Sequence, residues 1–242
     1  MTISNDARAR IKGVFEPIAL ALGRAGLTPD ALTLIGFAIT VVGAVLLSQQ
    51  QWLVGGLVVL LGGVFDMFDG TLARATGKVS PLGAFMDSVF DRWGETLVYL
   101  GIVIGCTNGG FADGVVVAVA AMGAAFMVSY TRAKSEGLGF TIGTGMAAIG
   151  IMPREIRLVV LSLGLVATGL AGGVEVLSLL YQFGIELPGG LFLDLKAGRG
   201  FLVIALAIIV VGATITTIQR ILHVRAQAKR QTTSDTSPSA QS

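Results

Sequence analysis

The chain has 242 residues, of which 53% are hydrophobic and 13% are charged, with 34 glycines and a formal net charge of +2. Its mean hydropathy of +0.80 lies far above that of soluble globular proteins, which excludes an ordinary water-soluble domain. We expect an integral membrane protein that has lipids, and no nucleic acid, among its partners.

The N-terminal segment, residues 1–26, is expected to lie beside the membrane as an amphipathic helix. Within it, residues 6–22 place Ile11, Val14 and Phe15 among several basic side chains. This mixture is typical of a helix at the membrane interface, with its apolar side in the lipid. Pro17 would bend that helix.

Six apolar runs follow, covering residues 31–48, 52–65, 96–106, 114–130, 158–180 and 201–218. A helix needs about 20 residues to cross a hydrocarbon layer of roughly 30 Å, so the second and third runs must extend into the polar segment between them. Continuous runs of this length also exclude the alternating strands of a membrane barrel. We therefore predict an all-α domain of six transmembrane helices over residues 27–225, followed by a disordered cytoplasmic tail, residues 226–242.

Lys and Arg residues predict the orientation of these helices. They gather before the first run, between the second and third, between the fourth and fifth, and after the sixth: Arg8, Arg10, Lys12 and Arg24, then Arg74, Lys78 and Arg92, then Arg132, Lys134, Arg154 and Arg157, and last Arg220, Arg225, Lys229 and Arg230. The positive-inside rule places these segments and both termini in the cytoplasm. Only Lys196 and Arg199 fall on the other side.

Four aspartates lie in the polar segment FDMFDGTLARATGKVSPLGAFMDSVFDR, residues 65–92. Asp66 and Asp69 are spaced i, i+3 and Asp87 and Asp91 are spaced i, i+4, so each pair shares one helical face. Two antiparallel helices would bring both faces together, where uncompensated carboxylates repel one another. One or two divalent cations would remove this repulsion, and the all-oxygen ligand set favours Mg²⁺ or Mn²⁺. Carboxylates that simply face water are the alternative.

The same segment resembles the complete signature of the CDP-alcohol phosphotransferase family, in the motif Asp66-x2-Asp69-Gly70-x2-Ala73-Arg74-x8-Gly83-x3-Asp87-x3-Asp91. The stretch LTPDALTLIG, residues 27–36, is similar to the segment that leads into the family's first span, with Asp30 where Asn is usual. The resemblance implies transfer of a phosphatidyl group from a CDP-linked lipid to an alcohol, with release of CMP. Such chemistry needs metal ions and basic groups to balance the pyrophosphate charge.

The resemblance also implies roles for individual residues. Asp66, Asp69 and Asp87 would bind two Mg²⁺ ions, with Mn²⁺ as the alternative, and Asp91 would take the alcohol proton and also contact an ion. For Arg74 the alternative is a simple anchor at the inner membrane face. The residues expected to hold CDP-diacylglycerol are Pro29, Asp30, Ala31, Leu32, Asp66, Asp69, Gly70, Ala73, Arg74, Ser80 and Gly83.

Basic residues from three spans predict that the acceptor carries a phosphate. Lys134 closes the fourth span, Arg154 and Arg157 open the fifth, and Arg220 ends the sixth. Together with Thr131 they would form a pocket for a phosphorylated alcohol. Ordinary inner-face charge that meets anionic lipid is the alternative reading. Arg199 is excluded from the set because it lies on the opposite side.

Four stretches are similar to the actinobacterial phosphatidylinositol phosphate synthases of this family: SYTRAKSEGLG, PREIR, DSVFDR and IQRILHVR. This likeness implies inositol 1-phosphate as the acceptor and a homodimer in the bacterial inner membrane, with the active site facing the cytoplasm. The loop between Phe140 and Pro153 departs from that subfamily because it has no acidic residue.

Two other functions stay open from the sequence. A phosphatidylglycerol phosphate synthase would share the fold, signature and donor and would use glycerol 3-phosphate, although its usual Asp-Lys ending is replaced here by Asp91 and Arg92. A cation transporter could also use carboxylates within the membrane. It should place them near mid-membrane and often shows an internal repeat, whereas these lie near one face.

Overall fold

The computed structural model describes residues 5–140, 149–172 and 195–235. Within these ranges every regular element is an α-helix, which confirms the all-α prediction. The helices are α1 (Asn5–Arg24), α2 (Pro29–Ser48), α3 (Trp52–Ala75), α4 (Pro81–Asn108), α5 (Ala112–Gly137), α6 (Arg154–Gly172) and α8 (Leu195–Asp235).

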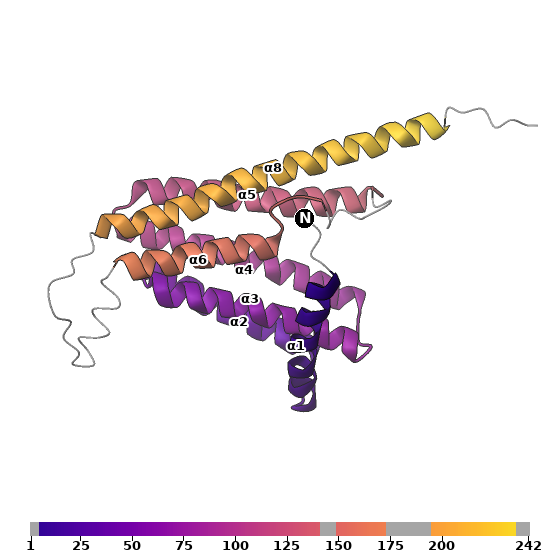
Figure 1. The fold of residues 1–242 in the computed structure, drawn as a ribbon, viewed down its shortest axis with the longest axis horizontal. Coiled ribbons are helices and arrows are strands. Elements are labelled where there is room, and N and C mark those ends of the chain that lie inside the picture. Colours follow the sequence, from indigo (N-terminus) through magenta and orange to yellow (C-terminus); the bar gives the residue numbers. More distant parts are fainter. Residues whose placement is uncertain (1–4, 141–148, 173–194, 236–242) are drawn as a thin grey trace, which may run out of the picture.

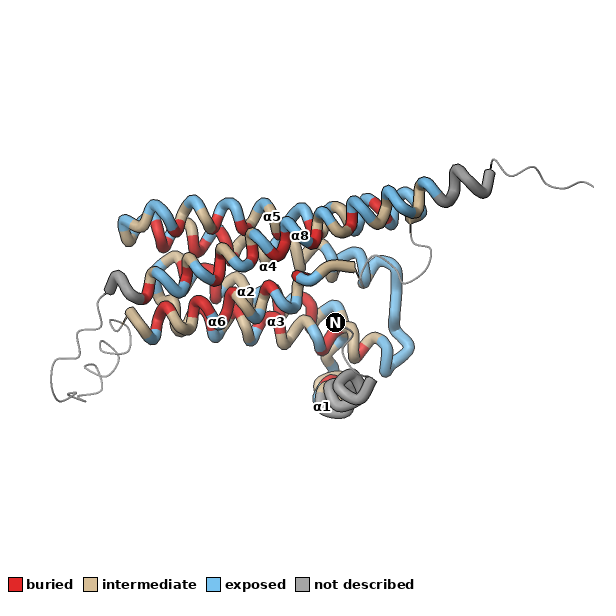
Figure 2. Tube along the Cα trace, turned by 45° about the horizontal axis from the view of Figure 1, so that its top comes forward, coloured by how far each residue is buried: buried red, intermediate tan, exposed pale blue. Residues whose placement is uncertain are grey.

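The helices after α1 run side by side, as Figures 1 and 2 show from two directions. Their contacts close into a ring. Going round the ring, α2 packs on α3, α3 on α6, α6 on α8, α8 on α5, α5 on α4, and α4 on α2. All six contribute to one apolar core, through side chains that include Leu47, Val59, Ile102, Ala121, Leu165 and Leu206. Helices that follow one another in the chain run in opposite directions, so both ends of the ring collect residues from distant parts of the sequence.

The outside of the ring is also apolar. Leu34, Val42, Leu57, Val116 and Leu163 each expose more than half of their surface. Within the described ranges, α2, α3, α5, α6 and residues Gly198–Lys229 of α8 are long and apolar enough to cross a membrane. A polypeptide with an apolar core and an apolar exterior is suited to lipid, and the chain is a multi-pass membrane protein.

Helix α4 belongs to the ring but is not among those five. Its residues 87–95 include Asp87, Asp91, Arg92 and Glu95, and the apolar part that follows Glu95 is too short to cross a bilayer alone. As the sequence required, both α3 and α4 extend from their apolar runs into the aspartate segment.

Helices α2 and α4 begin with the same local arrangement. The Thr28 side chain accepts a hydrogen bond from the Ala31 amide at 3.2 Å, and the Ser80 side chain accepts one from the Gly83 amide at 3.0 Å. Each capping residue is followed by a proline, which lacks the amide hydrogen that a first helical turn leaves unpaired. Two well-defined helix N-termini result.

Helix α1 crosses one end of the ring (Figure 1). Phe15 and Ala19 pack against Leu32, Phe68 and Leu72 of α2 and α3, and the Phe15 and Phe68 rings lie 5.3 Å apart. Residues 5–24 are helical as predicted, while the amphipathic character of this helix and its placement at the membrane interface stay predictions.

One predicted boundary differs from the structure. Helix α8 continues to Asp235, so residues 226–235, expected to be disordered, are helical. The segment AQAKR, residues 226–230, consists of good helix formers, which favour continuation of the helix. The fifth run was expected to reach residue 180; residues 173–194 lie outside the described ranges, so this boundary stays a prediction.

Close packing between α2 and α4 gives a first testable prediction. A Cβ atom added at Gly101 would overlap the backbone carbonyl of Ala44, which has no freedom to move aside. Gly101→Ala should lower the free energy of unfolding by about 1–3 kcal/mol, seen as a lower thermal midpoint in detergent. Gly123→Ala is the control, because nothing lies within 4 Å of its added Cβ. Equal midpoints for the two variants would contradict the described packing.

Candidate active site

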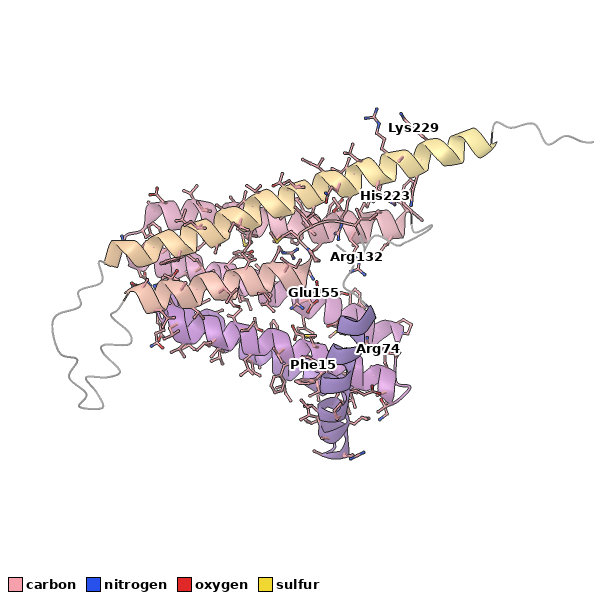
Figure 3. The ribbon with its side chains drawn as sticks, viewed as in Figure 1. Phe15, Arg74, Arg132, Glu155, His223 and Lys229 are labelled. Atoms are coloured by element: carbon pink, nitrogen blue, oxygen red, sulfur yellow. The ribbon has the colours of Figure 1, made fainter. Side chains whose placement is uncertain are left out.

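One end of the ring holds the polar residues singled out in the sequence. This end collects the first turns of α2, α4 and α6 and the last turns of α3 and α5. Figure 3 shows Arg74 and Arg132 there. Arg199 lies at the other end, where it donates to the Gly109 carbonyl at 2.8 Å and sits 5.2 Å from the Phe111 ring. It lies away from the polar residues singled out in the sequence, as expected.

A cavity of about 270 Å³ lies between α2, α3 and α4 at this polar end. The predicted donor-binding residues that line it are Pro29, Asp30, Asp69, Gly70, Ala73, Arg74, Ser80 and Gly83. Thr33, Lys78, Val79, Ala84 and Asp87 complete its wall. The N-termini of α2 and α4 both open onto the cavity, so their dipoles and two cations give it an anion-binding side.

Three residues predicted for the donor site do not line this cavity. Leu32 is fully buried in the packing beneath α1. The Ala31 amide is used by the Thr28 cap. Asp66 points away from the cavity wall and toward α6, where Arg154 binds it.

Asp69 is held in place by α2. Its side chain accepts hydrogen bonds from the Thr33 hydroxyl at 2.5 Å and from the Gly70 amide, and the residue is 5% exposed. Sequence analysis missed Thr33. Its position one turn after Pro29 on α2, on the same face, is the signal that could have found it.

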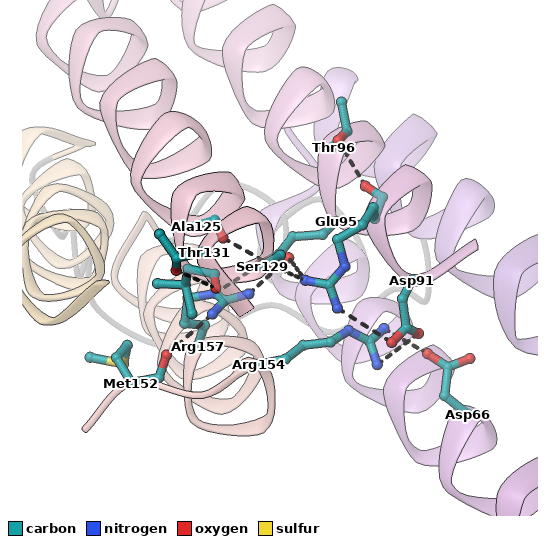
Figure 4. Close-up of polar contacts among 12 residues, drawn as sticks. Asp66, Asp91, Glu95, Thr96, Ala125, Ser129, Thr131, Met152, Arg154 and Arg157 are labelled. Carbon is teal, nitrogen blue, oxygen red and sulfur yellow. Dashed lines mark hydrogen bonds and ion pairs between the residues drawn. The ribbon is translucent and has the colours of Figure 1, made fainter. Parts of the chain in front are cut away.

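Asp66 and Asp91 are joined by an arginine (Figure 4). Arg154, the first residue of α6, donates from Nη2 to Asp66 Oδ2 at 2.8 Å and lies with Nη1 2.9 Å from Asp91 Oδ1. Gly36 of α2 makes room for this arrangement, because a Cβ there would overlap the Asp66 carboxylate. The four aspartates therefore form two pairs across the helices, with Asp69 and Asp87 at the cavity and Asp66 and Asp91 at Arg154.

The ion pairs continue along α4. Arg92 lies 3.4 Å from Asp91 and 3.1 Å from Glu95, and it also donates to the Ser129 hydroxyl of α5. Glu95 in turn binds Arg157 of α6 through both carboxylate oxygens, at 2.8 and 2.9 Å. Such a two-point contact is the strongest geometry for an arginine and a carboxylate. It fixes α4 against α6.

Arg157 is buried within the protein. It is 1% exposed, and its remaining nitrogen donates to the Met152 carbonyl at 3.2 Å. Sequence analysis missed its partner Glu95, although Glu95 follows Asp91 by one helical turn and directly precedes an apolar run. An acid at such a position is seldom left unpaired in lipid.

The other residues predicted for the acceptor lie on α5 and α8. Arg220 is buried and donates to the Val128 carbonyl and, at 3.0 Å, to the Ile149 carbonyl. The Thr131 hydroxyl approaches the same Val128 carbonyl at 3.0 Å. Lys134 is exposed one turn further along α5. Phosphate binding by these side chains stays a prediction, and residues 141–148 of the connecting loop lie outside the described ranges.

As they stand, no three acidic, histidine or cysteine side chains in the described part of the chain converge closely enough to hold a metal ion. Arg154 occupies the space between two of the carboxylates, and Thr33 engages a third. The chemistry of the group nevertheless fits an oxygen-preferring divalent cation, since Asp66 and Asp91 already share one cationic partner.

The family model described as CDP-alcohol phosphatidyltransferase matches residues 26–224. The chain belongs to this family. It is 34% identical over 228 residues to the phosphatidylinositol phosphate synthase of Streptomyces avermitilis, which covers 93% of this chain and 84% of that protein. It is also 34% identical over 173 residues to the archaetidylinositol phosphate synthase of Pyrococcus horikoshii, which covers 72% of this chain and 87% of that protein.

The fold of this family member is also found in solved structures. The phosphatidylinositol phosphate synthase of Mycobacterium tuberculosis with bound CDP-DAG superposes with a TM-score of 0.68 and 26% identity, over 95% of this chain and 97% of that one. The same enzyme in complex with manganese and citrate gives a TM-score of 0.67 over 94% and 92% of the two chains, also at 26% identity.

Glu95 provides the second prediction. Glu95→Gln removes the carboxylate charge opposite Arg157, which is buried, and opposite Arg92. Loss of one partner of a buried pair should lower the free energy of unfolding by about 3 kcal/mol. Glu136→Gln is the matched control, because the Arg132–Glu136 pair is exposed and contributes about 0.5 kcal/mol. Thermal midpoints in detergent compare the two, and an equally stable Glu95→Gln protein would refute the buried-pair role.

Proposed function

We propose that this family member transfers the phosphatidyl group of CDP-diacylglycerol to inositol 1-phosphate, giving phosphatidylinositol phosphate and CMP. One observation carries the proposal: α4 places Asp87 in the cavity and Asp91, one turn on, beside the Arg154 cation. The donor and the acceptor would therefore meet on adjacent turns of one helix.

The donor is assigned to the cavity between α2, α3 and α4. Arg74 and Lys78, together with two helix N-termini, would attract its pyrophosphate. Gly70 and Gly83 leave the backbone accessible to the nucleotide, because an added Cβ at either position meets only side-chain atoms at 3.1 Å or more. The M. tuberculosis relative with bound CDP-DAG supports this assignment.

Divalent cations would be held by Asp66, Asp69, Asp87 and Asp91, and we propose two of them, with Mg²⁺ as the physiological ion. When bound, such an ion neutralises charge on the pyrophosphate and stabilises the leaving phosphate. The manganese complex of the M. tuberculosis relative supports a divalent cation in this family.

Asp91 is assigned as the general base. Its carboxylate lies 3.4 Å from Arg92 on the same helix, which orients it for a hydroxyl group. It would accept the acceptor's hydroxyl proton while the acceptor oxygen forms a bond to the phosphorus that carries diacylglycerol. The bond from that phosphorus to the CMP oxygen then breaks, and CMP leaves.

The acceptor's phosphate is assigned to the cations on the α5, α6 and α8 side. Lys134 and Arg154 would contact it, while Thr131, Arg157 and Arg220, each engaged by protein groups, would shape the pocket. Inositol phosphate is favoured because the S. avermitilis and P. horikoshii relatives are both named for it although their lipids differ. Glycerol 3-phosphate is the second candidate, since it also carries a phosphate.

We further propose α4 as a sixth span and assign the polar end to the cytoplasm of a bacterial inner membrane, with both termini on that side. The charges of α4 are paired with neighbouring helices, which reduces the cost of placing them at the membrane face. Residues 27–225 would form the catalytic domain, as a homodimer.

An acceptor panel tests the assignment. Purified protein with CDP-diacylglycerol should release CMP when given inositol 1-phosphate, and much less with glycerol 3-phosphate, free inositol or serine. Excess EDTA should abolish the activity, and added Mg²⁺ or Mn²⁺ should restore it, because the pyrophosphate charge must be balanced. Preference for glycerol 3-phosphate would transfer the assignment to a phosphatidylglycerol phosphate synthase.

The same assay tests the acceptor pocket. Lys134→Gln should raise the acceptor KM about tenfold, because a charge-assisted bond to phosphate is lost, and should leave the KM for CDP-diacylglycerol unchanged. Arg199→Gln, at the opposite end of the ring, serves as the control. Equal effects of the two substitutions on both substrates would show that Lys134 acts only through stability.

A further inference from the structure

Arg154 is unable to bind the acceptor's phosphate and the Asp66 and Asp91 carboxylates at the same time. It belongs to the cations assigned to the acceptor's phosphate, yet both of its terminal nitrogens are engaged by Asp66 and Asp91, at 2.8 and 2.9 Å. These carboxylates are also assigned to a divalent cation. One arginine and one ion therefore compete for the same two side chains.

The neighbouring arginine shows that this competition is particular to Arg154. Arg157, one turn along α6, is locked by Glu95 and the Met152 carbonyl and its side chain is 2% exposed. The Arg154 side chain is 26% exposed. In the part of the chain that the structure describes, its hydrogen bonds and ion pairs run to Asp66 and Asp91 alone. If it left them, it would need a new anion.

The position of Arg154 suits such a movement. It is the first residue of α6, so its long, flexible side chain starts from a helix end and not from within the packed ring. The N-terminus of α6 carries a partial positive charge that favours a phosphate nearby. A phosphate bound there would lie within reach of the displaced guanidinium.

We propose that Arg154 is an exchangeable cation. It neutralises Asp66 and Asp91 until a divalent ion takes them, and it then binds the acceptor's phosphate. The inference rests on the proposed function for the identity of the acceptor. It implies that the ion and the acceptor bind cooperatively, since each relieves the Arg154 contact that opposes the other.

Manganese binding tests the exchange without any substrate. In calorimetric titrations of the purified full-length protein in detergent, Arg154→Gln should bind Mn²⁺ about tenfold or more tightly than the wild type, because a charge-assisted competitor has been removed. Arg154→Lys, which keeps the charge, should lie between them and serves if the glutamine variant fails to fold. Arg132→Gln, paired with exposed Glu136, should leave the affinity unchanged. Unchanged or weaker Mn²⁺ binding by both Arg154 variants would overturn the exchange.

A second titration tests the coupling. Mn²⁺ should tighten binding of inositol 1-phosphate to the wild type about tenfold, and this gain should largely disappear in Arg154→Gln. An equal gain in both proteins would show that the ion attracts the phosphate directly and would overturn the coupling. Tighter Mn²⁺ binding in a protein that fails the acceptor panel would support the exchange and reject only the function. CMP release in the acceptor panel, together with unchanged Mn²⁺ affinity in the Arg154 variants, would support the function and reject the exchange.

Discussion

A chain of alternating charges joins three helices at the polar end of the ring. It runs from Asp66 of α3 through Arg154 of α6 to Asp91, Arg92 and Glu95 of α4, and it ends at Arg157 of α6. Its three acids and three bases balance one another. In apolar surroundings an unpaired charge is so unfavourable that each member depends on its neighbours. This dependence explains how α4, which carries Asp91, Arg92 and Glu95, packs inside a ring of apolar helices.

The same chain sets the position of the chemistry. Three acids lie on successive turns of α4: Asp87 at the cavity, Asp91 at Arg154, and Glu95 at buried Arg157. The first would serve the donor, the second the proton transfer and the third the support of the helix. Because Glu95 is held through two hydrogen bonds, the helix is fixed, and the two acids that precede Glu95 keep a fixed position and orientation relative to α6. A rigid helix is a more exact support for a reacting group than a loop would be.

Much of this arrangement could be predicted from the sequence, because it depends on local spacing. The i, i+3 and i, i+4 aspartates, the apolar runs, and the Thr28-Pro29 helix start are all short-range patterns. The pairings across helices were not accessible in this way. Asp66 binds Arg154 and does not face the cavity that Asp69 lines, and Arg157 binds Glu95. Both pairings follow from the order of the helices round the ring. A single sequence gives each span but not its neighbours.

The measurement that tests the central claim most directly is a competition between acceptors, with the lipid product identified by mass spectrometry. Purified protein in lipid vesicles would receive CDP-diacylglycerol, Mg²⁺, and equal concentrations of inositol 1-phosphate and glycerol 3-phosphate. We expect phosphatidylinositol phosphate as the main new lipid, formed in equal amount with CMP. Phosphatidylglycerol phosphate as the main product, or CMP without any new phospholipid, would contradict the account.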